Sequence, residues 1–102
     1  MAKSKKKLSP IHPGEILLEE FMKPGGLSAN KLALELRVPS NRIVAIVSGK
    51  RALSADTALR LARYFRTTAD FWMHLQAGYD LQQAEDESAE TIARQVQPCD
   101  AA

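Results

Sequence analysis

The stretch LSANKLALELRVPSNRIVAIVSGKR, residues 27–51, decides the fold that we expect for this chain. Ser28 can cap a first helix through its hydroxyl, and Pro39 ends that helix because the residue before a proline avoids the α region. Ser40 can cap a second helix, and Gly49 stands where a glycine is typical after a helix C-terminus. Two short helices joined by a turn of about three or four residues predict a helix-turn-helix.

The apolar residues of this stretch recur at helical spacing and indicate which side of each helix is buried. The expected core-facing residues are Leu32, Ala33, Leu36, Ile43, Ile46 and Val47. The residues of the second helix expected nearer to solvent are Asn41, Arg42, Ala45 and Ser48. A helix of about eight residues fits the major groove of B-DNA, which is roughly 12 Å wide. The alternative is an ordinary helical hairpin with a solvated polar face.

DNA binding would use two kinds of side chain on these helices. Asn41 and Arg42 are candidate base readers because asparagine pairs with adenine and arginine with guanine, and Ala45 could pack on a thymine methyl group. Lys50 and Arg51 follow the second helix and are placed to hold phosphates. The predicted DNA-binding residues are Ser28, Asn30, Lys31, Ser40, Asn41, Arg42, Ala45, Ser48, Lys50 and Arg51.

The segments on either side of this stretch also favour helices. His12 and Pro13 open a helix that should end near Lys23, and His12 suits a local capping role better than a metal site. On the C-terminal side, another helix covers residues 53–65, with Ser54 as its cap. Thr68 begins a shorter helix, in which we expect the heavy apolar side chain of Phe71 to pack in the core. Residues 80–97 have a thin apolar stripe, which is typical of a helix that frays or extends from the body.

Charge is unevenly distributed along the chain. Residues 1–78 hold 13 Lys and Arg against 6 Asp and Glu, whereas residues 79–102 hold one Arg against 6 acidic residues. A basic body suits a partner lined with phosphates, and the acidic end should point away from it. We interpret residues 1–10 as a disordered basic arm, which either follows the DNA backbone or serves only as a solubilising tail.

Several other classes of protein are disfavoured. The sequence has no apolar run long enough for a membrane span and no secretory signal. The lone Cys99 cannot form an internal disulfide, so we expect a reducing bacterial cytoplasm. No nucleophile elbow, phosphate loop or metal-ligand cluster stands in the sequence. We therefore expect no enzymatic activity, no metal, no cofactor and no small-molecule substrate.

A longer pattern resembles a known family over residues 11–81. Residues 27–51 are similar to the lambda-repressor/Cro-like (XRE) helix-turn-helix. The segments "HPGE", "VPSNRI", "SGKR", "ADTALRLARYF" and "FWMHLQAGYDL" together resemble the HigA/VapI-type antitoxins. The resemblance implies an all-α, compact five-helix lambda-repressor-like DNA-binding domain with a C-terminal helical extension. We divide the chain accordingly into the arm (1–10), the DNA-binding domain (11–78) and an acidic C-terminal helix and tail (79–102).

The same resemblance implies a function. It implies an antitoxin that neutralises a cognate HigB/RelE-like mRNA-cleaving toxin and represses the operon that encodes both proteins. It also implies a homodimer on a palindromic operator in double-stranded DNA, with a dimer contact through the C-terminal helices. We assign this contact to Trp72, Leu75, Tyr79 and Leu81.

Two departures from the family pattern keep other functions open. Ala29 stands where relatives often have a glutamine that contacts the DNA backbone, and Val44 and Ala45 stand where relatives commonly carry polar base readers. One alternative is therefore a toxin-sequestering subunit that binds DNA only weakly. The other is a phage or plasmid repressor without a toxin partner.

Overall fold

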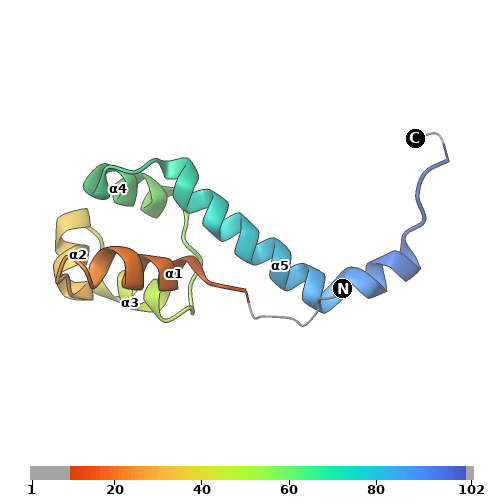
Figure 1. Ribbon diagram of the computed structural model, residues 1–102, viewed down its shortest axis with the longest axis horizontal. Helices are drawn as coiled ribbons and strands as arrows, with labels where there is room; N and C mark the ends of the chain where they lie inside the picture. The colour runs from red at the N-terminus through yellow and green to blue at the C-terminus, as the bar shows by residue number, and fades with distance from the viewer. Residues whose placement is uncertain (1–9, 101–102) are drawn as a thin grey trace.

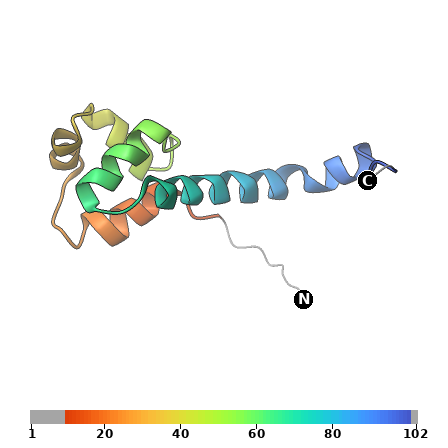
Figure 2. The same cartoon turned by 90° about the horizontal axis from the view of Figure 1, so that it is seen from above.

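The computed structural model describes residues 10–100, and every regular element in that range is helical. The elements are α1 (Pro13–Ile16), η1 (Leu17–Met22), α2 (Ala29–Leu36), α3 (Ser40–Val47), α4 (Ala55–Phe65) and α5 (Ala69–Gln95). Figure 1 shows α1 to α4 gathered into one body around the start of α5, and Figures 1 and 2 show the rest of α5 projecting away from it. The predicted all-α fold with a C-terminal helical extension is therefore confirmed. Apart from Pro10, the predicted basic arm lies outside the described residues.

One hydrophobic core holds the body together. Its buried hydrophobic residues are Leu17, Met22, Leu32, Ala33, Leu36, Ile43, Ile46, Leu53, Ala58, Leu61 and Trp72. They come from η1, from both helices of the helix-turn-helix, from α4, from Leu53 in the loop that leads to α4, and from the first turn of α5. The core side predicted for α2 and α3 is thus confirmed, except that Val47 is only half-buried.

The two neighbouring aromatic residues at the start of α5 exchange the roles that we predicted for them. Trp72 is fully buried, and its indole N–H donates a hydrogen bond of 2.8 Å to the Thr67 hydroxyl. The assignment of Trp72 to a dimer contact is therefore wrong, because its side chain is enclosed within its own chain. Phe71, which we expected in the core, is 38% exposed and packs edge-on against Trp72. Consecutive helical residues point about 100° apart, so with Trp72 directed into the core, Phe71 lies toward its edge.

The first helical segment begins as predicted but changes pitch. His12 Nδ1 accepts a hydrogen bond of 2.9 Å from the Gly14 N–H, which confirms the predicted capping role. From Leu17 the segment continues as the π-helical η1 and ends at Met22, close to the predicted end. Gly14 is buried against α3, where an added Cβ would overlap the Ile46 carbonyl group. This close approach fixes the start of α1 on the end of α3.

The ends of α2 and α3 agree with the sequence in part. Ser28 caps α2 by accepting the Lys31 N–H at 3.1 Å, as predicted. However, α2 ends at Leu36, because Arg37 adopts a left-handed conformation (φ 62°), so Pro39 lies beyond the helix end. Pro39 is also the N-cap of α3, and the prediction that Ser40 caps this helix is wrong: Pro39 holds the extended conformation that a cap requires.

The C-terminal end of α3 follows the predicted pattern. Gly49 has a φ of 80°, and its N–H donates to the Ile46 carbonyl, while the Lys50 N–H donates to the Ala45 carbonyl. These two bonds form a Schellman motif, which satisfies the last carbonyl groups of the helix. The chain therefore turns sharply after α3 and places the basic residues of the following loop beside it.

The expectation of a short helix after Thr68 is wrong, because α5 runs without a break from Ala69 to Gln95. Gly78 costs a helix only about 1 kcal/mol, and neither a proline nor a left-handed residue interrupts α5. Pairs such as Gln82–Asp86 and Arg94–Glu90 at i,i+4 add local support. The predicted boundary between residues 78 and 79 thus falls inside a continuous helix.

Candidate nucleic-acid interface

The side of α3 that faces solvent is a stripe of four residues, which we call the outward stripe. It consists of Asn41, Val44, Ala45 and Ser48. Their spacing of i, i+3, i+4 and i+7 places them on one face, opposite the fully buried Ile43 and Ile46. Asn41, Val44 and Ser48 are exposed and Ala45 is half-buried. This stripe is the surface that α3 can offer to a DNA groove.

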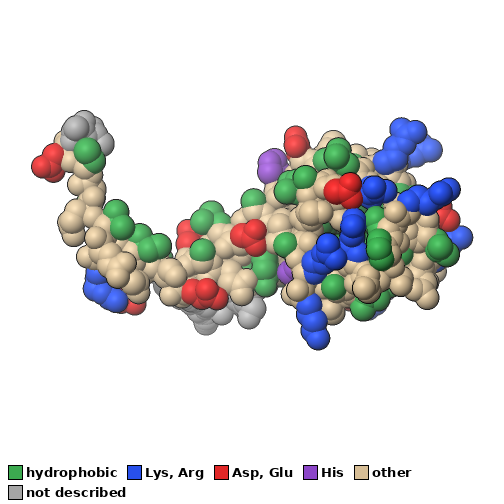
Figure 3. Space-filling view, turned by 180° about the vertical axis from the view of Figure 1, so that it is seen from behind, with side chains coloured by type: hydrophobic (Ala, Val, Ile, Leu, Met, Phe, Trp, Pro, Cys, Tyr) green, Lys and Arg blue, Asp and Glu red, His purple; other side chains and the backbone are tan. Residues whose placement is uncertain are grey.

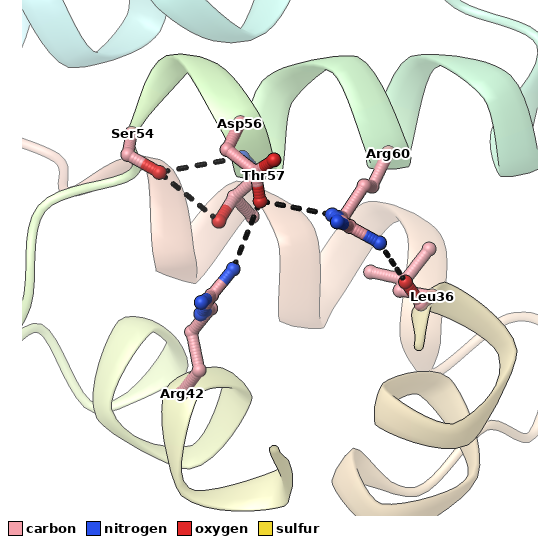
Figure 4. A network of polar contacts seen from close by, with 6 residues as sticks. All are labelled: Leu36, Arg42, Ser54, Asp56, Thr57 and Arg60. Carbon is pink, nitrogen blue, oxygen red and sulfur yellow. Dashed lines mark hydrogen bonds and ion pairs between the residues drawn. The ribbon is translucent and has the colours of Figure 1, made fainter. Parts of the chain in front are cut away.

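Arg42 lies at the flank of α3, away from the outward stripe. Its side chain is only 23% exposed, and its Nη1 donates a hydrogen bond of 3.0 Å to Asp56 Oδ2 of α4. Figure 4 shows the Arg42 side chain extending from α3 toward α4. Its Nε is buried without a hydrogen-bond partner. The predicted base reader is thus turned toward the body in the free protein, so its role as a base reader stays a prediction.

Asp56 joins Arg42 to a second arginine. Arg60 Nε donates to the same Asp56 oxygen at 2.9 Å, and Arg60 Nη1 donates to the Leu36 carbonyl at 2.9 Å (Figure 4). The hydrogen bond from Arg60, followed by that from Arg42, lowers the pKa of the exposed Asp56 carboxyl below its ordinary value. Since Leu36 is the last residue of α2, Arg60 satisfies a free carbonyl at a helix end. The network therefore links α2, α3 and α4, and it adds to the core packing of Ile43 and Ile46 that orients α3.

Four of the predicted DNA-binding residues lie at the surface on α2 and in the loop after α3. Asn30, Lys31, Lys50 and Arg51 are all exposed. Lys31 forms an ion pair of 3.2 Å with Glu35 on the same exposed helix face, a contact that contributes little and can be exchanged for a phosphate. Figure 3 shows Lys and Arg side chains gathered on the body, while Asp and Glu dominate the projecting helix. The body is thus the part of the molecule suited to a polyanion.

The predicted serines are placed differently from one another. Ser28 and Ser40 are exposed, but the Ser28 hydroxyl already caps α2. The Ser48 hydroxyl donates a hydrogen bond of 3.2 Å to the Ala45 carbonyl of its own helix. Ser40 stands in the first turn of α3, beside Asn41.

Sequence reasoning noted Val44 at a position where relatives carry base readers but left it out of the predicted DNA-binding residues, and it missed the Asp56–Arg60 pair. Val44 is 51% exposed at the centre of the outward stripe. The i, i+3, i+4, i+7 spacing from Asn41 was present in the sequence and would have found it. No spacing rule predicts the contact of Arg42 with Asp56, because it joins two helices across a loop.

The predicted dimer residues that remain available lie on α5. Leu75 and Tyr79 are half-buried, and Leu81 is 61% exposed. Beyond them, the outer part of α5 presents an apolar groove lined by Leu81, Ala84, Glu85, Ala89, Ile92 and Ala93. This face is separate from the outward stripe, so one chain can offer both surfaces at once.

Other kinds of site find little support in the described part of the chain. No group of three or more metal-ligating side chains occurs among residues 10–100. Over the same residues, no helix combines the length and the apolar character needed to cross a bilayer.

His12 is half-buried at the start of α1, and burial lowers its pKa, although a backbone hydrogen bond with Arg51 acts in the opposite sense.

The helix-turn-helix geometry is matched by a known family model. A model described as "Helix-turn-helix" matches residues 18–72, from η1 to the buried Trp72. The chain belongs to this helix-turn-helix family. This is a family of transcription regulators and not an enzyme class. The chain is also 52% identical over 83 residues to virulence-associated protein I of Dichelobacter nodosus, a match that covers 81% of this chain and 77% of that protein.

Two solved structures show the same fold. The antitoxin HigA of Pseudomonas aeruginosa, solved with the higBA promoter, is 44% identical with a TM-score of 0.86, and the match covers 87% of this chain and 97% of HigA. An addiction module antidote protein of the HigA family from Coxiella burnetii is 49% identical with a TM-score of 0.85, covering 90% of this chain and all (100%) of that one. The predicted resemblance to HigA/VapI-type proteins is therefore confirmed.

Proposed function

We propose that this chain is a sequence-specific DNA-binding antitoxin of the bacterial cytoplasm. It neutralises a cognate HigB/RelE-like mRNA-cleaving toxin and represses the operon that encodes both proteins. The observation that carries this proposal is the exposed face of α3, which stands in a helix-turn-helix and is flanked by the exposed cations Lys31, Lys50 and Arg51. The likeness to a HigA antitoxin solved with its promoter supports it.

The division of labour within the interface follows from the chemistry of its residues. Lys50 and Arg51 hold phosphates, which fixes the position of the body on the duplex without reading sequence. The outward stripe of α3 enters the major groove and contacts base edges. The buried Ile43 and Ile46 hold α3 on the body, and the network of Arg42, Asp56 and Arg60 adds to this support.

A homodimer completes the proposed function. Leu75, Tyr79 and Leu81 on α5 form its contact, together with the apolar groove of the outer part of that helix. Two-fold symmetry then requires a palindromic operator, with half-sites about 34 Å apart, one turn of B-DNA. The acidic outer part of α5 stays away from the phosphates.

Binding to DNA is tested by fluorescence anisotropy with a labelled duplex from the region upstream of the gene. A scrambled duplex of the same length and composition is the control, and both are measured at two salt concentrations. We expect the upstream duplex to bind about a thousandfold more tightly than the scrambled one. Equal, weak and salt-sensitive binding to both duplexes would contradict specific readout and favour the toxin-sequestering subunit.

Toxin neutralisation is tested by co-expression. The gene next to this one is induced alone and together with the full chain, and growth and mRNA integrity are followed. We expect the neighbouring gene to arrest growth and cleave mRNA only when this chain is absent. Specific DNA binding without any toxic neighbour would favour a phage or plasmid repressor instead.

A further inference from the structure

We propose that Val44 is a specificity-determining residue, whose isopropyl group contacts the 5-methyl group of a thymine in the major groove. This inference rests on the proposed DNA-binding function and names the chemical group that α3 recognises. Val44 is 51% exposed and lies at the centre of the outward stripe. Within α3, all of whose residues are described, it is the one large hydrophobic side chain that is exposed.

The polar groups near Val44 are largely committed to other contacts. Ser48 donates its hydroxyl proton to the Ala45 carbonyl, and Arg42 gives its guanidinium to Asp56. The outward stripe therefore offers one free amide, that of Asn41, beside an apolar pair formed by Val44 and Ala45. A surface of this kind discriminates mainly by shape and apolar contact.

Thymine is the base that fits such a pair. In the major groove each base pair presents hydrogen-bond donors and acceptors, and thymine alone adds an apolar methyl group. Val44 cannot donate or accept a hydrogen bond, so a contact with a donor or acceptor edge would leave that edge unpaired. Against a methyl group, both apolar surfaces leave water, which is favourable.

The charges around the stripe indicate that DNA, rather than a second protein, covers Val44. Lys31 on α2 and Lys50 and Arg51 after α3 are exposed cations near the two ends of the helix-turn-helix. The stripe itself carries no charge. An uncharged stripe with exposed cations before and after it in the helix-turn-helix suits a groove floor that lies between two rows of phosphates.

The test removes the methyl group without changing base pairing. Within the tightest-binding upstream duplex, each thymine is replaced in turn by deoxyuridine, which keeps the same hydrogen bonds and charge. Affinities of the full chain are measured by anisotropy at two salt concentrations for the wild type, for Val44→Ala and for Leu59→Ala. Leu59 is the matched control, since it is 63% exposed but lies on α4, outside the stripe.

Each half-site should contain one thymine whose single replacement by deoxyuridine weakens wild-type binding about fourfold. This factor corresponds to about 0.8 kcal/mol, the contribution of one buried methyl-sized group. This ratio should be the same at both salt concentrations, because an apolar contact releases no counterions. Val44→Ala should bring the ratio close to one, whereas Leu59→Ala should retain it.

Two kinds of result would overturn the inference, and they differ in whether the proposed function survives. If the wild type binds the upstream duplex specifically but tolerates deoxyuridine at every position, or if Val44→Ala keeps the fourfold ratio, the methyl contact is wrong and the proposed function survives. If the wild type does not prefer the upstream duplex over a scrambled one, both the proposed readout and the role of Val44 fall together.

Discussion

The two parts of α5 show how differently one helix can be supported along its length. The inner part, residues 69–79, contributes the buried Trp72 and Gln76 to the body, whereas none of residues 80–95 is buried. The two regions also differ in charge: basic residues outnumber acidic ones in the body, and acidic residues outnumber basic ones in the outer part of α5. The body therefore has its own core and a basic surface suited to DNA, while the outer part has an apolar groove that no other part of the described chain covers.

The largest expected effect is on stability, and it separates the two parts directly. Trp72→Ala should lower the free energy of unfolding by about 3–5 kcal/mol, because it removes a fully buried aromatic side chain. Ile92→Ala in the outer part, where Ile92 is 52% exposed, should change it by less than about 0.5 kcal/mol. Urea unfolding under monomeric conditions measures both. A similar loss for the two variants would contradict the division.

The next effect is on self-association. Leu81→Glu should weaken dimerisation by about 2 kcal/mol or more per copy. Burial of a leucine side chain in the proposed contact contributes about 1.5–3 kcal/mol, and the glutamate would lose this contribution and bury a charge. Leu59→Glu is the control, since Leu59 is as exposed as Leu81 but lies on α4. Sedimentation velocity over a range of concentrations gives the dissociation constants. A Leu81→Glu protein that remains dimeric would refute the α5 contact.

A smaller effect is expected at His12, where the body meets α5. Its ring packs edge-on against Tyr79, with centroids 4.8 Å apart, and its Nδ1 must be unprotonated to accept the Gly14 N–H. His12→Ala should cost about 0.5–2 kcal/mol at neutral pH, as for other N-caps. The measurement is the free energy of unfolding across pH 5 to 8.

The pH dependence at His12 has a defined sign. The folded state lowers its pKa from the ordinary 6.5, so the stabilisation is present above pH 6.5 and is lost as the pH falls through the lower pKa of the folded chain. His12→Asn keeps an acceptor for the cap without a titrating group, and should remove this part of the pH dependence. An unchanged pH profile in His12→Asn would show that His12 does not act as a neutral cap.

The smallest expected effect is that of Arg42 on DNA selectivity. Because Arg42 is paired with Asp56 at the flank of α3, Arg42→Ala should change the ratio of operator to scrambled affinity by less than about fivefold. Anisotropy with both duplexes measures the ratio. A selective loss of operator binding well above this value would show that Arg42 leaves Asp56 and reads a base, as the sequence alone predicts.

Much of the body can be predicted from sequence because its signals are local. The caps at Ser28 and Ser54, the glycine after α3 and the role of His12 each depend on residues no more than a few positions apart. The outward stripe was predicted in part, since periodicity gives the angle of a side chain around a helix. The assignment of Arg42 to that stripe depended on what lies beside α3, which a single helix does not reveal.

The other errors have the same origin. Phe71 and Trp72 are both large aromatic residues, and only the packing of α5 on the body decides which one is buried. Arg37 and Arg66 adopt left-handed conformations, and a sequence does not predict these because residues other than glycine seldom have a positive φ. The predicted boundary after Gly78 is not a helix end, because Gly78 has no left-handed φ and α5 continues through it.

The central claim, that the outward stripe of α3 reads DNA sequence, is tested most directly by comparing Asn41→Ala with Lys50→Ala. The ratio of operator to scrambled affinity is measured by anisotropy for each variant and for the wild type. We expect Asn41→Ala to reduce this ratio by about fivefold or more, because an amide–base contact is worth about 1–3 kcal/mol, whereas Lys50→Ala should weaken both duplexes equally. An unchanged ratio in Asn41→Ala would contradict the claim that α3 reads the bases through this face.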